Sequence, residues 1–266
     1  MFVQVSRDSS GIRAGADRDR RDRCRWVVDV VALLLMATGC SGNSPPAEAP
    51  SSGSTSTAVS TEPAHACPNP HGGSCLGPLD AGEYTTEEFH PTLTYSVPAG
   101  WDNEEDLSGN FLLLPPGEDL AGVDAGTSDY VGVYTGVKAS GGCDGLADAG
   151  FTPQQVAAVI RHDPNLEVTR PRQTEIGGLR GLVMDIQLTQ DPSKDCPSFG
   201  EAGHAVPLIL GVPPSSLDHA MVDGLTMRLY LLAHDGGSLA IEVDDVHHGQ
   251  NLTDYSKLIR HFDFGG

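Results

Sequence analysis

The chain has 266 residues and a formal net charge of −20, with 36 Asp and Glu against 16 Lys and Arg. A surface this acidic repels nucleic acid and anionic lipid headgroups, so we expect no nucleic-acid partner and no electrostatic binding to a membrane. The part of the chain after residue 80 is long enough for one good core and too short for two domains of comfortable size.

The first 39 residues have the outline of a signal peptide. Five Arg between residues 18 and 25 form a basic region, and Val30–Met36 is apolar but far shorter than the roughly 20 residues that span a bilayer. The segment 35–40, LMATGC, then resembles a bacterial lipobox, in which Cys40 becomes the lipidated N-terminus. Asp29 and Ala37 depart from the usual pattern. We therefore expect a chain anchored through lipid at Cys40 to the extracytoplasmic face of the cell membrane.

A segment rich in Ser, Thr, Pro and Gly follows, from Ser41 to about Thr61. It cannot bury enough apolar surface to offset its ordering entropy, so we expect a disordered tether that reaches roughly 25 Å on average. The alternative is that Cys40 merely ends a short buried helix. It is disfavoured, because the segment that follows Cys40 is a tether and not part of a folded domain. Removal of residues 1–39 leaves a net charge of −22, so the lipid has to provide the membrane binding.

Of the six cysteines, Cys24 leaves with the signal peptide and Cys40 carries the lipid. Four remain, and an even number in an exported chain favours two disulfides. We favour Cys67–Cys75, because the turn-forming residues 68–73 can bring the two together, and Cys143–Cys196 then follows by elimination. The other two pairings stay open. A zinc site is disfavoured, because the spacing is not that of a CxxC pair and His71 is the only nearby His.

Six segments of the domain have the alternation or the apolar runs typical of strands. The clearest pair flanks Asp235-Gly236, a dipeptide that predicts a hairpin with a tight turn. The predicted strands are 92–97, 110–114, 130–134, 181–188, 227–233 and 238–243.

Two helices are predicted among these strands. Thr152, Pro153 and Gln155 form a capping box that opens the first helix, which ends at 163–164. Asn251 caps a final helix that runs to about His261. The fold class is therefore α+β, a single domain with an antiparallel sheet and two main helices. The expected division of the chain is a signal peptide over 1–39, the lipidated Cys, tether and Cys67–Cys75 loop over 40–80, and the globular domain over 81–266.

The run 89–101, which ends in Pro-x-Gly-Trp, resembles the opening of a group of actinobacterial envelope lipoproteins with no assigned activity. The resemblance continues through 110–115, 174–181 and 228–232 and covers most of 82–264. Three Lys beside thirteen Arg also indicate a GC-rich genome. More loosely, the Pro-x-Gly-Trp strand, the strand after Gly177-Gly178 and the terminal helix resemble a PsbP/Mog1-like sandwich. That second resemblance implies a fold and no function.

Motifs that would identify a reaction are missing from the sequence: it has no GxSxG, P-loop, HExxH or GxGxxG opening a helix. Residues 135–138 loosely match SxxK, but with Thr for Ser, at the end of a strand and without a KTG partner. The acidic run 102–106 lacks the ligand spacing of an EF-hand and is interpreted as a solvated turn after Trp101. Trp101 itself is expected in or at the rim of the core.

One local cluster could bind a metal, since Asp244, Asp245, His247 and His248 fall within five residues. In an extended segment Asp245 and His247 share a face, and a distant third ligand could complete a site. The interpretation we favour is a polar loop between a strand and the last helix.

The sequence therefore predicts no catalytic residue and no cofactor. We expect a non-catalytic binding or scaffolding module for an envelope protein or a small-molecule ligand. The alternative is a metal-assisted hydrolase that uses Asp244, Asp245, His247 or His248.

Overall fold

The computed structural model describes residues 76–142, 150–190, 192 and 204–265. Cys40 and the four cysteines of the predicted disulfides, Cys67, Cys75, Cys143 and Cys196, lie outside these ranges, as do the signal peptide and the tether. Lipidation, both disulfides and the division of the chain into segments stay predictions. Among the described residues, no helix combines the length and the apolar character needed to cross a membrane.

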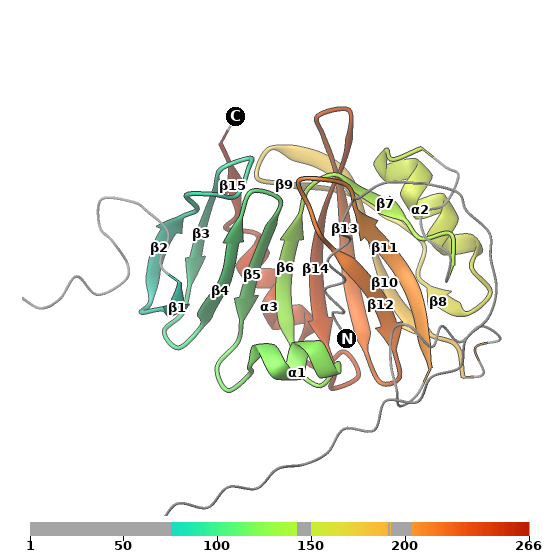
Figure 1. The fold of residues 1–266 in the computed structure, drawn as a ribbon, viewed down its shortest axis with the longest axis horizontal. Helices are drawn as coiled ribbons and strands as arrows, with labels where there is room; N and C mark the ends of the chain where they lie inside the picture. Colours follow the sequence, from blue (N-terminus) through green and yellow to red (C-terminus); the bar gives the residue numbers. More distant parts are fainter. Residues whose placement is uncertain (1–75, 143–149, 191, 193–203, 266) are drawn as a thin grey trace, which may run out of the picture. The chain divides into compact units, whose positions relative to one another are not determined.

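A nine-stranded sheet, antiparallel at every pairing, is the main element of the domain (Figure 1). Eight strands follow one another across it, and β9 (Arg172–Ile176) pairs with β10 beside this path. In sheet order the eight are β1 Gly77–Pro78, β4 Asp102–Leu107, β5 Asn110–Leu114, β6 Tyr130–Tyr134, β14 Gly237–Asp245, β13 Thr226–His234, β10 Leu179–Leu188 and β8 Leu166–Val168. The α+β class with an antiparallel sheet is confirmed.

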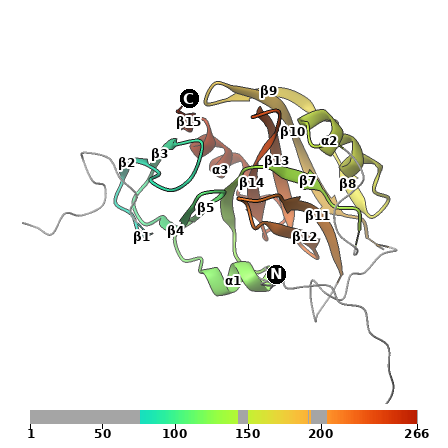
Figure 2. The ribbon, with the colours of Figure 1, turned by 45° about the horizontal axis from the view of Figure 1, so that its top comes forward.

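Within the described residues, two three-stranded sheets and three helices accompany the main sheet (Figure 2). One small sheet has the order β15-β3-β2 and the other β12-β11-β7. Their bounds are β2 Gly82–Thr85, β3 Leu93–Val97, β15 Asp263–Phe264, β7 Val137–Ala139, β11 Ala205–Gly211 and β12 Asp218–Val222. The helices are α1 Leu120–Ala125, α2 Pro153–His162 and α3 Leu252–Ile259.

The main sheet buries both faces, because successive side chains of a strand point to opposite sides. Val183, Tyr230 and Ile241 belong to a core shared with α3 and the β15-β3-β2 sheet. Met184 and Leu229 belong to a second core shared with α2 and the β12-β11-β7 sheet. The central strands β10, β13 and β14 therefore separate two hydrophobic cores.

The predicted turns and caps match the structure in most details. Asp235 and Gly236 have φ of 47° and 73°, and His234 pairs with Gly237, so the hairpin between β13 and β14 has a two-residue turn. The backbone N–H and the hydroxyl of Thr152 both donate to Gln155 Oε1 at the start of α2. Trp101 is buried in the first core, as expected.

The acidic segment 102–106 differs from the prediction of a solvated turn, which is wrong. It forms β4, in which the pairing with β5 shifts register between Asn103 and Glu105. The neighbours Glu104 and Glu105 therefore do not follow the regular alternation of side chains between the two faces of the sheet. Asn103 is fully buried, and the carboxylate of Asp106 accepts backbone N–H groups of Glu87 and Phe89 at 2.8 Å. Asp106 is bound to the loop before β3 and Asn103 to Tyr95 on β3, so composition alone did not indicate a strand.

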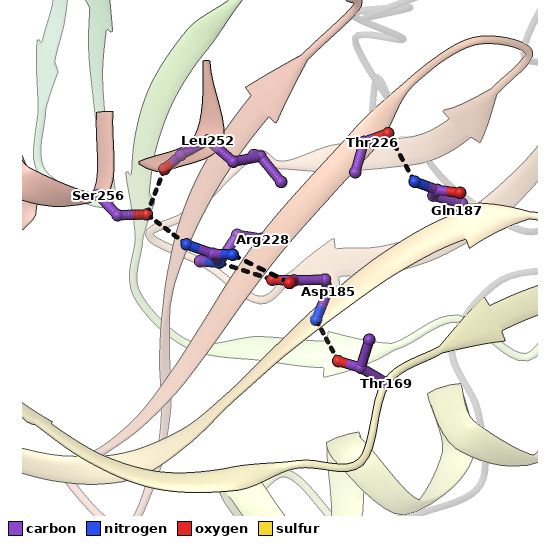
Figure 3. A network of polar contacts seen from close by, with 7 residues as sticks. All are labelled: Thr169, Asp185, Gln187, Thr226, Arg228, Leu252 and Ser256. Atoms are coloured by element: carbon purple, nitrogen blue, oxygen red, sulfur yellow. Dashed lines mark hydrogen bonds and ion pairs between the residues drawn. The ribbon is translucent and has the colours of Figure 1, made fainter. Parts of the chain in front are cut away.

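A polar network joins β10, β13 and α3 on the α3 side of the main sheet (Figure 3). Arg228 Nε and Nη2 donate to the two oxygens of its cross-strand partner Asp185 at 2.6 and 2.9 Å. Arg228 Nη1 donates to Ser256 Oγ at 2.9 Å, and Ser256 donates to the carbonyl of Leu252. The guanidinium thus connects α3 to the centre of the sheet.

Candidate functional site

Four buried polar side chains gather where β12 packs against the end of β14. They are His219 on β12, Glu242 and Asp244 on β14, and Tyr130 on β6. Glu242 and Asp244 are two residues apart in one strand, so they share a face. Tyr130 is the cross-strand partner of Asp244, and Gly132 is the partner of Glu242. Sheet register alone therefore brings the phenol and the two carboxylates together under β12.

Both nitrogens of the His219 ring face a carboxylate. Nδ1 lies 3.2 Å from Glu242 Oε2, and Nε2 lies 3.7 Å from Asp244 Oδ2. The Tyr130 hydroxyl lies 2.8 Å from His219 Nδ1 and donates to Glu242 Oε2 at 3.1 Å. Phenol, imidazole and Glu242 therefore form a tight triangle, with Asp244 on the opposite side of the ring.

Acceptor oxygens in this cluster lack hydrogen-bond donors. Among the described residues, no hydrogen bond reaches Glu242 Oε1 or either oxygen of Asp244. Glu242 and Asp244 are both fully buried. A buried carboxylate oxygen without a donor is costly, and such a group calls for a water or an ion that supplies the missing contact.

Burial and mutual charge shift the pKa values of the cluster. Burial raises the pKa of Asp244 to about 7, against the opposing effect of the His219 imidazole. Burial alone would lower the pKa of His219, but Glu242 and Asp244 outweigh it, and the pKa is raised. Burial holds the pKa of Tyr130 well above its usual 10, so the phenol keeps its proton at neutral pH.

A pocket opens onto this cluster between α1, β12 and the end of β14. The pocket is small and partly open to solvent. Its polar lining includes Tyr130, His219 and Asp244, and its apolar wall includes Val123 and Val222. The pocket thus brings solvent close to the buried carboxylate of Asp244.

The four metal candidates predicted from the sequence are divided between different places. Asp244 belongs to the buried cluster, whereas Asp245 points to the other face of β14. Asp245 accepts the backbone N–H groups of His247, at 2.7 Å, and Asn251, which fixes the loop before α3. His247 and His248 are exposed. Among the described residues, each group of three or more potential ligands contains at most one of the four predicted candidates.

A second group of potential ligands consists of Glu118, Asp129 and His247. The carboxylate of Asp129 already accepts three hydrogen bonds, from the backbone of Val246 and the side chains of Asn251 and Tyr255, at 2.8–2.9 Å. These bonds hold the loop between β14 and α3 in place. Asn251, predicted as a helix cap, therefore donates to Asp129 instead. This group serves the structure of the loop.

Sequence reasoning missed His219, Glu242 and Tyr130. Glu242 could have been found, because it is the one charged residue in the predicted strand 238–243 and lies two residues before Asp244, on the same face of the strand. His219 carried none, since it lies in a segment without a clear periodic pattern. Its contact with β14 depends on how two sheets pack.

Comparison with known proteins gives a distant likeness in structure and none in sequence. No protein-family model and no curated protein matches the chain. Among solved structures, the chain is similar to cyanobacterial PsbP (CyanoP) from Synechocystis sp. PCC 6803, with 10% sequence identity and a TM-score of 0.34. The match covers 72% of this chain and 98% of that chain. At this TM-score the likeness carries no functional argument, and the actinobacterial lipoprotein family stays a prediction.

Proposed function

We propose that the chain is a lipid-anchored bacterial envelope protein whose domain binds a ligand in the pocket beside Asp244 and does not catalyse a reaction. The observation that carries the binding role is the carboxylate of Asp244. It is fully buried, it accepts no hydrogen bond from the described residues, and it lines a pocket that solvent can enter. A concave site with a few convergent polar groups is the usual form of a ligand site.

The state of the other groups supports binding over catalysis. Tyr130 keeps its proton because its pKa is raised by burial, so it supplies no nucleophile at neutral pH. His219 faces carboxylates at both nitrogens, which leaves it poorly placed to take a proton from a substrate. The alternative hydrolase that uses Asp244, Asp245, His247 and His248 loses support, because these residues do not converge.

Anchoring follows from the sequence. The lipobox-like segment that ends at Cys40 supplies the membrane partner, and the tether from 41 to 61 separates the domain from the bilayer. A net charge of −22 on the exported chain keeps the domain itself off an anionic surface. The ligand of the pocket comes from the envelope space, as a small molecule or ion or as part of another envelope protein.

The full chain and its Cys40→Ala variant, expressed in an actinobacterial host, test the anchor. We expect the wild-type chain to partition into the detergent phase, and the variant to stay an unprocessed precursor that is not lipidated. Normal processing and partitioning of the variant would contradict the anchor.

Native mass spectrometry of the same detergent-extracted chain tests the binding role. A stoichiometric added mass that disappears in Asp244→Asn supports it, whereas bare wild-type and variant chains contradict it.

A further inference from the structure

We infer that the pocket binds a divalent transition-metal ion, of the zinc or manganese class, through His219, Glu242 and Asp244. This inference deepens the proposed function and depends on it for the pocket as the place of binding. One ligand atom from each of the three side chains lies within 4.8 Å of the others. Metal bonds of about 2.0–2.2 Å to nitrogen and oxygen place ligand atoms roughly 3–4 Å apart, so small movements complete the site.

Charge balance favours a doubly charged ion. Glu242 and Asp244 bring two negative charges into a site that is fully buried. An imidazolium at His219 compensates one of them, and one negative charge stays buried. A divalent ion beside a neutral imidazole compensates both, so the buried cluster becomes neutral.

The ion also supplies what the unused oxygens lack. Glu242 Oε1 and both oxygens of Asp244 accept no hydrogen bond from the described residues, and a cation is a partner for each of them. Asp244 and His219 also line the pocket, so water can fill the remaining coordination positions.

The surroundings of His219 match those of a metal ligand. Its Nδ1 side contacts the Tyr130 hydroxyl at 2.8 Å and Glu242 Oε2 at 3.2 Å, while its Nε2 side faces Asp244. A metal-bound histidine commonly has its other nitrogen held by a carboxylate or another polar group, which fixes the ring. Here Glu242 Oε2 and the Tyr130 hydroxyl lie at Nδ1, which leaves Nε2 and the second Glu242 oxygen, Oε1, for the ion. One imidazole with two carboxylates suits zinc or manganese, whereas calcium prefers an all-oxygen set.

The group of Glu118, Asp129 and His247 is the rival site. The carboxylate oxygens of Asp129 already accept three hydrogen bonds, and the side chain of His247 is exposed. A metal there would have to displace the bonds that hold the loop before α3. His247→Gln therefore serves as the matched control for substitutions in the buried cluster.

The experiment is calorimetric titration of the full chain, extracted in detergent and stripped of metal with a chelator, with zinc chloride and then manganese chloride. We expect one ion per chain for at least one of the two metals. Asp244→Asn and Glu242→Gln, which keep the side-chain shape, should weaken binding at least tenfold, whereas His247→Gln should leave it unchanged. Circular dichroism of each variant, and a metal-induced rise in melting temperature seen only in wild type and His247→Gln, show that the effect is not unfolding.

The inference is overturned if the folded wild-type chain binds neither metal, or if Asp244→Asn binds as tightly as wild type. Loss of binding in His247→Gln alone would overturn it in favour of the rival site. An organic ligand in the native mass spectrum without metal binding overturns the metal and leaves the binding role intact. Metal binding that Asp244→Asn abolishes, together with metal-dependent turnover of a substrate, supports the metal and overturns the non-catalytic role.

Discussion

The carboxylates of this domain differ in how far their oxygens are hydrogen-bonded, and this difference distinguishes the cluster around His219. Asp129 and Asp106 are nearly inaccessible, and each accepts three hydrogen bonds. Asp185 is held by both prongs of the Arg228 guanidinium. Around Glu242 and Asp244, by contrast, three described carboxylate oxygens stay buried without a donor: Glu242 Oε1 and both oxygens of Asp244. Three such oxygens in one cluster leave room for a ligand that supplies the missing contacts.

The Arg228 network gives a prediction at the same scale. Arg228→Lys should lower the free energy of unfolding by about 1–3 kcal/mol, because an ammonium cannot bond both oxygens of Asp185 and reach Ser256 as well. Arg180→Lys is the control, since its pair with Glu175 is exposed and surface pairs contribute little. Urea unfolding of both variants measures the difference. Equal losses in the two variants would show that the two-pronged geometry of the half-buried Arg228–Asp185 pair does not matter.

Among the elements, the hairpin between β13 and β14 determines the register that places Glu242 and Asp244. Its turn has two consecutive residues in the left-handed region, Asp235 at φ 47° and Gly236 at φ 73°. Such a turn matches the twist of the two strands it joins. A slip by one residue would move both carboxylates to the α3 face of the sheet.

Gly236→Val tests this element. A Cβ at Gly236 meets no atom within 4 Å, so the cost arises from the backbone and not from a clash. The left-handed conformation costs a residue with a Cβ roughly 1–2 kcal/mol, and we expect a loss of unfolding free energy of about that size. Asp235→Asn should leave stability unchanged, because Asn tolerates this region. Thermal unfolding of both variants measures the effect; an unperturbed Gly236→Val would mean that the turn does not control the hairpin.

Elements with a local signal could be predicted and elements that depend on partners could not. The segments 110–114 and 130–134 were apolar runs bounded by turn residues, and they form β5 and β6 with those bounds. β4 was missed because the carboxylate of its Asp106 is satisfied by bonds to residues 87–89, which no periodicity reveals. For the same reason only Asp244 of the buried cluster was a candidate. His219 joins it through the packing of two sheets that are separate in hydrogen bonding.

At the scale of the whole molecule, one face of the main sheet packs against α3 and a small sheet, and the other face carries the candidate site. On one face, the Arg228 network and the aromatic core fix α3 and the β15-β3-β2 sheet. On the other, β12 covers the polar end of β14 and α1 closes the pocket. The site is thus separated from the α3 side by the full thickness of the sheet. Ligand binding at Asp244 can therefore be altered without disturbing the packing of α3.

The oxidation state of the cysteines can also be predicted for the whole chain. An exported protein meets an oxidising environment, so we expect the four cysteines that remain after lipidation to form Cys67–Cys75 and Cys143–Cys196. The second bond closes a long loop, worth about 4 kcal/mol in the chain-entropy account. Peptide mapping of the full chain without reduction identifies the pairs directly. Free thiols at all four positions would contradict export to an oxidising compartment, whereas a crossed pairing would contradict only the assignment.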